Sequence, residues 1–131
     1  MAEKALLERL DRLHRENKNR TILEEIAALP EETRREYAIQ GRLARALGNL
    51  GELKKALAVL EATREEGRDD PLWWYRTGRA LFGLERFLEA RPYFVRALEL
   101  DPEDRESRYF AGLCGTAGNK AGGGPGKGNK Y

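Results

Sequence analysis

The chain has 131 residues, enough for one domain with one continuous core, and 35% of them are charged, which favours a soluble protein built from amphipathic helices. Its 24 basic and 22 acidic residues leave a net charge of +2, but residues 1–104 carry 19 basic against 21 acidic side chains. A broad basic surface of the kind that binds nucleic acid is therefore excluded, and we expect no nucleic-acid partner.

Membrane insertion and secretion are also not expected. No apolar run approaches the roughly 20 residues that cross a bilayer. The first residues, MAEKALLERLDRLHRE, are charged throughout and lack the apolar stretch of a signal peptide. Cys114 is the single cysteine, which excludes an internal disulfide and favours a reducing compartment. We expect a cytoplasmic protein.

In chain order, the first expected helix covers residues 3–16, where leucines recur at helical spacing. Thr21 followed by Glu24 has the spacing of a capping box and predicts the start of a second helix. Pro30 suits the first turn of the next helix, which we expect to continue over residues 31–48.

After a turn at residues 49–51, a helix is predicted over residues 52–65, followed by a strong break at residues 67–71. Two further helices are predicted over residues 72–83 and 86–100. Because no segment alternates with period two, we expect no sheet and predict an all-α protein.

The sequence repeats itself when it is shifted by 34 residues, which aligns four blocks that start at Glu3, Tyr37, Pro71 and Arg105. Small residues fill most of one column, and bulky residues fill two others. These columns are Leu10/Ala44/Gly78/Gly112, Leu13/Leu47/Leu81 and Ile26/Leu60/Phe94. Small residues let the two helices of a hairpin approach closely, and bulky residues fill the space between successive hairpins.

The third block carries the most specific pattern, with Trp74, Gly78, Leu81, Ala90, Phe94 and Pro102 at fixed spacing. With these residues, positions 3–115 resemble the tetratricopeptide repeat (TPR) family. The second block departs from the pattern at Gln40 and Arg68. The alternative is a four-helix bundle with accidental periodicity.

The resemblance implies a right-handed superhelical stack of about three antiparallel helix hairpins and a short last helix. Residues 116–131, rich in glycine and lysine, are expected to form a flexible tail. The segment AGGGPGKGN within it is superficially like a phosphate-binding loop, but Ala121 and Gly128 stand where that motif needs glycine and Ser/Thr.

TPR arrays are protein-interaction scaffolds whose first helices line a concave groove, so the resemblance also implies a set of groove residues. They are Arg42, Arg45, Asn49, Tyr75, Arg76, Arg79, Phe82 and Tyr109. Arg45 shares a repeat column with Arg79, as Arg42 does with Arg76. Our hypothesis is that this arginine ladder binds a protein or peptide segment that carries carboxylates. The alternative is that the arginines form a solvated helix face and pair with nearby acids at little net energy.

A rival function is self-association, as a structural element or a homo-oligomer. Trp73 and Tyr75 flank Trp74, and three successive side chains cannot all point the same way from a helix. We expect Trp74 in the core and a contact patch that includes Trp73 and Phe110.

Catalysis is not expected. The chain has one histidine (His14) and one serine (Ser107) besides Cys114, and they are too few and too far apart in the sequence for a triad or a histidine metal site. We predict no enzyme activity, no metal and no cofactor.

Overall fold

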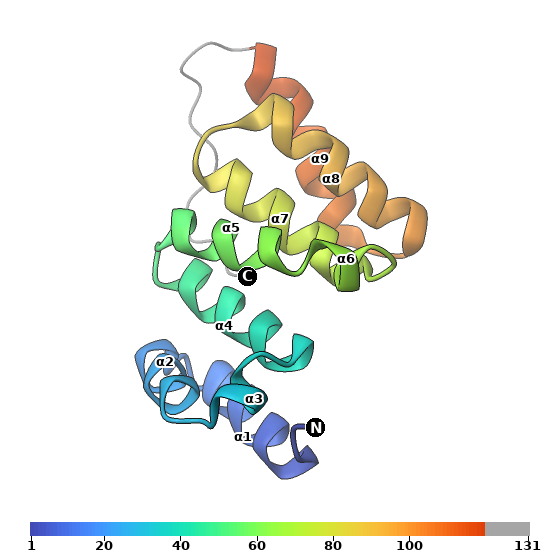
Figure 1. The fold of residues 1–131 in the computed structure, drawn as a ribbon. Coiled ribbons are helices and arrows are strands. Elements are labelled where there is room, and N and C mark those ends of the chain that lie inside the picture. Colours follow the sequence, from blue (N-terminus) through green and yellow to red (C-terminus); the bar gives the residue numbers. More distant parts are fainter. Residues whose placement is uncertain (120–131) are drawn as a thin grey trace. The chain divides into compact units, whose positions relative to one another are not determined.

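The computed structural model describes residues 1–119, and all the regular structure within them is helical (Figure 1). The all-α prediction is confirmed for this part of the chain. The helices are α1 (Lys4–Arg15), α2 (Asn19–Ala27), α3 (Glu31–Arg34), α4 (Tyr37–Asn49), α5 (Leu53–Ala62), α6 (Arg64–Gly67), α7 (Pro71–Gly83), α8 (Phe87–Leu100) and α9 (Arg105–Asn119).

The long helices recur at a constant interval. One series, α4, α7 and α9, begins at Tyr37, Pro71 and Arg105. The other series, α2, α5 and α8, begins at Asn19, Leu53 and Phe87. Successive starts in each series are 34 residues apart, which is the shift that aligns the sequence with itself.

The same tight turn joins the two helices of each hairpin. One residue in each turn is left-handed, with φ of 61° at Asn17, 80° at Gly51 and 61° at Glu85. The amide of the next residue donates to the carbonyl of the repeated leucine, Leu13, Leu47 or Leu81, at 2.9 Å in each case. This bond closes the first helix in the manner of a Schellman motif. The repeated leucine column therefore coincides with a repeated turn.

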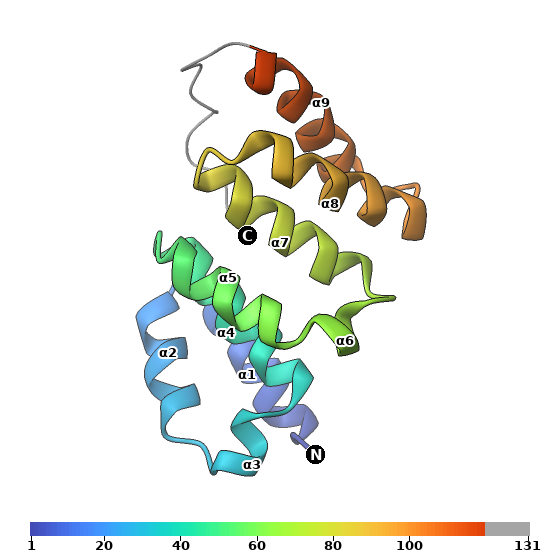
Figure 2. The same cartoon turned by 45° about the horizontal axis from the view of Figure 1, so that its top comes forward.

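Contacts divide the described chain into two compact units, residues 1–63 and residues 64–119. In the first unit α1, α2 and α4 pack against one another, and α4 also pairs with α5 (Figure 2). Their apolar faces bury Leu10, Leu13, Ile22, Ile26 and Ile39. Each such side chain stabilises the fold by roughly 1.5–3 kcal/mol when fully buried.

In the second unit α8 packs against both α7 and α9. Phe94 of α8 is fully buried and stacks on Phe110 of α9, with ring centroids 5.4 Å apart. Gly78 brings α7 close to the Phe94 ring, because a Cβ atom at this position would lie 2.9 Å from it. The small-residue column thus has the expected role in this hairpin.

The predicted helix over residues 31–48 is wrong in one respect, because it is two helices, α3 and α4, separated at Arg35 and Glu36. Side chains satisfy the carbonyls that this break and the end of α2 leave open. Arg34 donates to the carbonyl of Ala27 at 3.2 Å, and Gln40 donates to the carbonyl of Arg34 at 2.6 Å.

Two other boundaries differ from the expectation. The capping box at Thr21 is wrong, because α2 already begins at Asn19 and its cap residue, Lys18, makes no side-chain cap bond. The predicted helix over residues 52–65 ends early, at Ala62. The Thr63 hydroxyl donates to the carbonyl of Leu60 at 3.0 Å and so competes with the continuing helix.

At the other end of the chain, α9 runs to Asn119, four residues beyond the expected end of the helical domain at residue 115. The rest of the predicted tail, residues 120–131, lies outside the described residues.

Candidate partner-binding surface

Three of the predicted groove residues, Arg42, Arg45 and Asn49, follow one another on α4 at spacings of three and four residues. Residues at this spacing lie on one face of a helix. In the first unit α4 also packs against α1, which brings residues of α1 to these side chains. The neighbour that matters most is Asp11.

Asp11 accepts hydrogen bonds from both arginines. Arg42 holds it at two points, with Nε 3.0 Å from Oδ1 and Nη2 2.9 Å from Oδ2, and Arg45 Nη2 donates to Oδ1 at 3.0 Å. Asp11 lies 34 residues before Arg45, so it occupies the same repeat position in the preceding block. At this position the arginines are paired within the chain, as the alternative to the ladder hypothesis expects.

The charges around Asp11 do not balance. Burial raises the pKa of Asp11, but the hydrogen bonds and positive charges of Arg42 and Arg45 outweigh burial and hold the pKa below its ordinary value. Burial lowers the pKa of Arg45, Asp11 opposes this effect, and the like charges of Arg42 and Arg15 add to it. We name Arg15, Arg42 and Arg45 the cationic cluster: Arg42 and Arg45 bind one carboxylate, and the positive charge of Arg15 acts on Arg45.

Asn49 lies one turn beyond Arg45 and contacts other polar side chains of the first unit. Its Nδ2 is 3.4 Å from His14 Nδ1 and 3.4 Å from the Oδ1 of Asn19, which is buried. These contacts connect α4 with the end of α1 and the start of α2. Asn49 therefore helps to hold the first hairpin against α4.

In the second unit, three predicted groove residues are buried, which corrects the expectation that they face a partner. Tyr75, Arg79 and Phe82 lie on one face of α7, and this face packs on Phe110 of α9. The Phe82 and Phe110 ring centroids are 5.1 Å apart. This face of α7 is therefore not open to a partner, because the Phe110 ring of α9 packs against it.

Arg79 is stabilised in this aromatic setting by two contacts. Its guanidinium carbon lies 4.3 Å from the centre of the Phe110 ring, and Nη1 donates to the Tyr75 hydroxyl at 2.9 Å. A cation over an aromatic face is attracted by the ring quadrupole. Burial raises the pKa of Tyr75 to about 12, even though Arg79 lowers it, so the hydroxyl stays protonated at neutral pH. In this structure Arg79 joins α7 to α9.

The predicted contact patch is also wrong for two of its residues, since Trp73 is 1% exposed and Phe110 is 3% exposed. Trp73 fills the space that a side chain at position 67 would need, because that residue is Gly67. The Trp73 and Trp74 rings meet edge-on, with ring centroids 5.0 Å apart. Trp74, expected in the core, is only partly buried, and its Nε1 donates to the carbonyl of Arg68 at 2.8 Å. Tyr109, in contrast, is 59% exposed.

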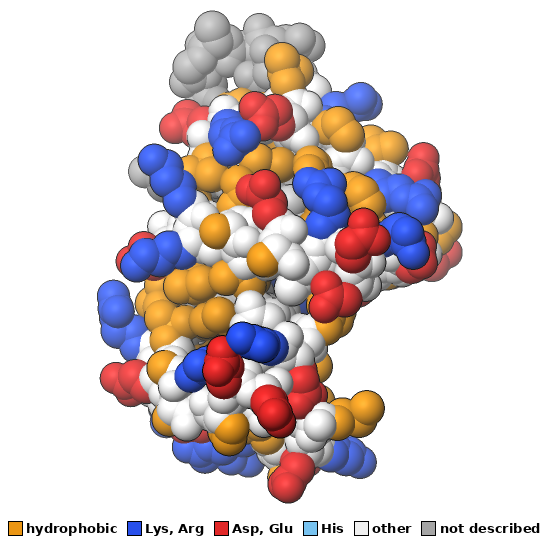
Figure 3. Space-filling model, viewed as in Figure 1, with side chains coloured by type: hydrophobic (Ala, Val, Ile, Leu, Met, Phe, Trp, Pro, Cys, Tyr) orange, Lys and Arg blue, Asp and Glu red, His pale blue; other side chains and the backbone are white. Residues whose placement is uncertain are grey.

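The alignment of Arg45 with Arg79 and of Arg42 with Arg76 stays a prediction, because the two members of each pair belong to different units. Arg76 is partly buried on α7. On the face shown in Figure 3, basic and acidic side chains are interspersed with apolar ones, and no broad basic area appears among the described residues.

Comparison with known families decides what kind of repeat this is. A tetratricopeptide repeat model matches residues 42–105 and, a second time, residues 78–123, which together make up more than half of the chain. The chain belongs to the tetratricopeptide repeat family. The comparison with curated proteins found no match.

Membership confirms the resemblance seen in the sequence and supplies the class of function. TPR repeats are protein–protein interaction modules, and the family is typically non-catalytic. The family match begins at residue 42, but the turn at Asn17 has the same geometry as the turns at Gly51 and Glu85. The α1–α2 hairpin thus shares the local design of the later TPR hairpins.

Asp11 is the residue of this TPR surface that the sequence analysis missed. A signal was present, because the 34-residue shift places Asp11 in the column of Arg45 and Arg79. An acid in one block and a base in the same column of the next predicts a contact between neighbouring first helices.

Other parts of the TPR chain offer little chemistry. Cys114 is fully buried, and burial raises the pKa of its thiol to about 11, so it is not a reactive thiolate at neutral pH. Within residues 1–119 no three His, Cys, Asp or Glu side chains form a group suited to a metal ion. None of the helices in this range has the length and hydropathy of a membrane span.

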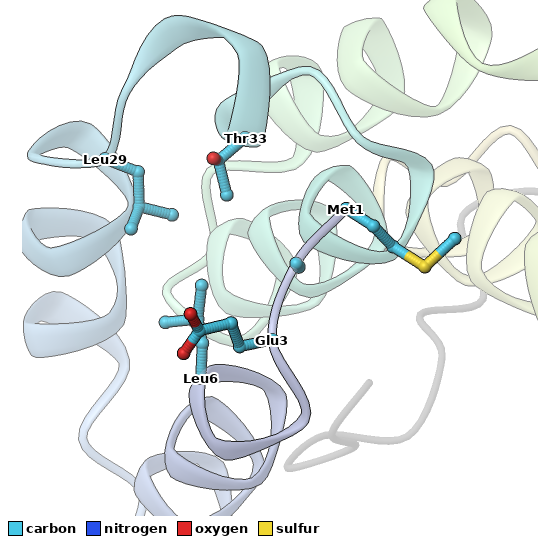
Figure 4. Close-up of a pocket in the computed structure, with 6 residues that line it drawn as sticks. Met1, Glu3, Leu6, Leu29 and Thr33 are labelled. Atoms are coloured by element: carbon cyan, nitrogen blue, oxygen red, sulfur yellow. The ribbon is translucent and has the colours of Figure 1, made fainter.

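A pocket of about 200 Å³ lies beside the start of α1, where Leu6, Leu29 and Thr33 face one another (Figure 4). Met1, Ala2 and Glu3 complete its lining, and the Met1 side chain points away from it. The ionisable groups of this lining are the Glu3 carboxylate and the N-terminal ammonium of Met1, and the ammonium already pairs with Glu36 at 3.3 Å.

Proposed function

We propose that this TPR chain binds a segment of a partner protein that carries carboxylates, and that the cationic cluster on α1 and α4 is the main contact. One observation carries the proposal: Arg42 and Arg45 already hold a carboxylate, that of Asp11, with three hydrogen bonds of 2.9–3.0 Å. The surface is thus chemically suited to the ligand proposed for it.

The geometry of the donors supports a carboxylate ligand. The planar fork of Arg42 presents Nε and Nη2 side by side, which matches the two oxygens of a carboxylate. The third guanidinium nitrogen of Arg42, Nη1, donates to the carbonyl of Ala38 at 2.9 Å. This bond fixes the plane of the fork. A guanidinium held in place loses less side-chain entropy when a ligand binds.

The local charge supports the same ligand. Two guanidinium groups, those of Arg42 and Arg45, bind the single carboxylate of Asp11, so a positive surplus remains after Asp11 is counted. Because Arg42 and Arg45 are partly buried, this surplus is screened less than charge on an open surface. Asn49 adds an amide near the cluster. Taken by itself, the second unit keeps Arg76 and Tyr109 as proposed contact residues.

The test is the affinity of the protein for a fluorescein-labelled oligo-glutamate peptide, measured by fluorescence anisotropy. The double variant Arg42→Gln/Arg45→Gln should weaken binding at least tenfold, since charge-assisted hydrogen bonds contribute roughly 1.5–3 kcal/mol each. Binding should also weaken as salt is added.

A matched control is Arg35→Gln/Arg96→Gln, which removes two exposed arginines that pair with acids three or four residues away in the chain. This control should change the affinity less than about twofold, because surface pairs contribute little. Equal losses in the two double variants would show that the peptide responds to net charge and would contradict the proposed site. Circular dichroism of each variant checks that the helices remain.

Exposed apolar side chains favour a second candidate, self-association. On the long helices of the second unit, Leu88 is 74% exposed, Tyr109 is 59% exposed and Leu72 is 45% exposed. Sedimentation experiments test this candidate. A mass that rises with protein concentration in the wild type, and stays constant in Tyr109→Ser, would favour self-association over a monomeric binding module.

A further inference from the structure

Asp11 occupies the donors that a partner's carboxylate would need. Three N–H groups point at its two oxygens, from Nε and Nη2 of Arg42 and from Nη2 of Arg45. The Asp11 side chain is 32% exposed, so a ligand in solution reaches it without unfolding the hairpin. A carboxylate from outside and Asp11 therefore compete for the same atoms.

We propose that Asp11 is an internal competitor that sets how strongly and how selectively the cationic cluster binds acidic segments. The inference rests on the proposed function and concerns the same surface. It assigns a role to a residue whose position in the repeat would otherwise hold an arginine, as Arg45 and Arg79 do in the following blocks.

Competition follows from the similarity of the two ligands. When a single carboxylate replaces Asp11, hydrogen bonds are exchanged for hydrogen bonds of the same kind, and little free energy is gained. The Asp11 charge also remains nearby and repels the incoming carboxylate, because both groups are negative.

Selectivity follows from the positive surplus. A segment with two neighbouring acidic residues places one carboxylate beside Asp11 and the other against the positive charge that Arg42 and Arg45 carry in excess of Asp11. A segment with one acidic residue only exchanges the hydrogen bonds of Asp11 for hydrogen bonds to its own carboxylate. Glu8, on the same face of α1, is strongly exposed and pairs with Lys4 at 3.8 Å, so it adds only screened repulsion. Asp11 thus favours segments with paired acids.

The experiment compares Asp11→Ala with Glu25→Ala. Glu25→Ala is a suitable control because it also removes one negative charge and one ion pair between two helices of the first unit. That ion pair joins Glu25 to Arg9 at 2.5 Å. Two labelled probes are used: an oligo-glutamate peptide and a Gly/Ser peptide with a single glutamate.

For Asp11→Ala we expect roughly tenfold tighter binding of the single-glutamate probe, from the repulsion removed, and a smaller gain for oligo-glutamate. Glu25→Ala should change either affinity less than about twofold. The isosteric variant Asp11→Asn, which keeps the side-chain volume, should shift affinity in the same direction. Equal effects of Asp11→Ala and Glu25→Ala, or a loss of affinity in both Asp11 variants, would overturn the inference.

The outcome for the proposed function is separate. If Arg42→Gln/Arg45→Gln still abolishes binding while the Asp11 variants resemble wild type, the inference fails and the proposed function stands. If neither wild type nor Asp11→Ala binds oligo-glutamate, both fail. If only Asp11→Ala binds, Asp11 excludes acidic segments from the wild-type protein, so the competition stands and the proposed function fails.

Discussion

Gly78 and Gly112 occupy the same repeat column but differ in what a side chain would meet. A Cβ atom on Gly78 would lie 2.9 Å from two ring atoms of Phe94, whose ring is fully buried. A Cβ atom on Gly112 would have no neighbour within 4 Å among the described residues. The need for a small residue therefore depends on the facing helix and not on the column alone.

This difference predicts opposite effects of one substitution. Gly78→Ala should lower the free energy of unfolding by about 1–2 kcal/mol, because overpacking against Phe94 outweighs the higher helix propensity of alanine. Gly112→Ala lies inside α9 and should be neutral or stabilising by up to about 1 kcal/mol. Urea unfolding of both variants checks the pair, and equal changes would contradict the packing argument.

Among the elements, the hairpin turns are the most regular feature, yet their left-handed positions hold three different residues. Gly51 suits a positive φ, Asn17 tolerates it, and Glu85 adopts it at a cost. Both hydrogen bonds of the turn are made at Glu85, with Glu85 N donating to Phe82 O at 2.9 Å beside the bond from Arg86 to Leu81. The turn geometry is therefore maintained in spite of the residue.

Relieving this strain should stabilise the second unit. Glu85→Gly should raise the free energy of unfolding by roughly 0.5–1 kcal/mol, after allowance for the greater entropy of glycine in the unfolded chain. The reciprocal change, Gly51→Ala, places a Cβ at φ of 80° and should destabilise by about 1 kcal/mol or more. Thermal unfolding of the two variants measures both shifts, and a destabilised Glu85→Gly would contradict the prediction.

At the scale of the whole molecule, two carboxylates that form ion pairs between helices link stability to pH. Asp11 of α1 binds Arg42 and Arg45 of α4, and Glu25 of α2 binds Arg9 of α1. Hydrogen bonding from Arg9 lowers the pKa of Glu25, and both carboxyl groups have a pKa below the ordinary value. Each group therefore stabilises the folded state when it is ionised.

Because the folded pKa lies below the unfolded one, this stabilisation is complete above the unfolded pKa of about 4 and is lost as pH falls through the folded pKa. Urea midpoints should accordingly fall between pH 5 and pH 2. The double variant Asp11→Asn/Glu25→Gln should start lower at pH 7 and fall less over the acid range. An unchanged acid dependence in that variant would show that other carboxyl groups are responsible.

Prediction from sequence was good where it depended on periodicity. The all-α class, the 34-residue register and the TPR family follow from columns such as Leu13/Leu47/Leu81. It was poorer at boundaries such as Arg35–Glu36, where side chains of Arg34 and Gln40 cap separate helices. It was poorest for exposure, as Trp73, Tyr75 and Phe82 show.

Sequence by itself determined the hairpins and their interval, because helix formation and tight turns depend on residues close together in the chain. Only the tertiary structure decided which face of each helix remains open. Phe110 covers the Arg79 face of α7, and Asp11 reaches the arginines of α4, through contacts between residues about 30 positions apart. Such contacts depend on how helices pack, and that packing sets which side chains a partner can reach.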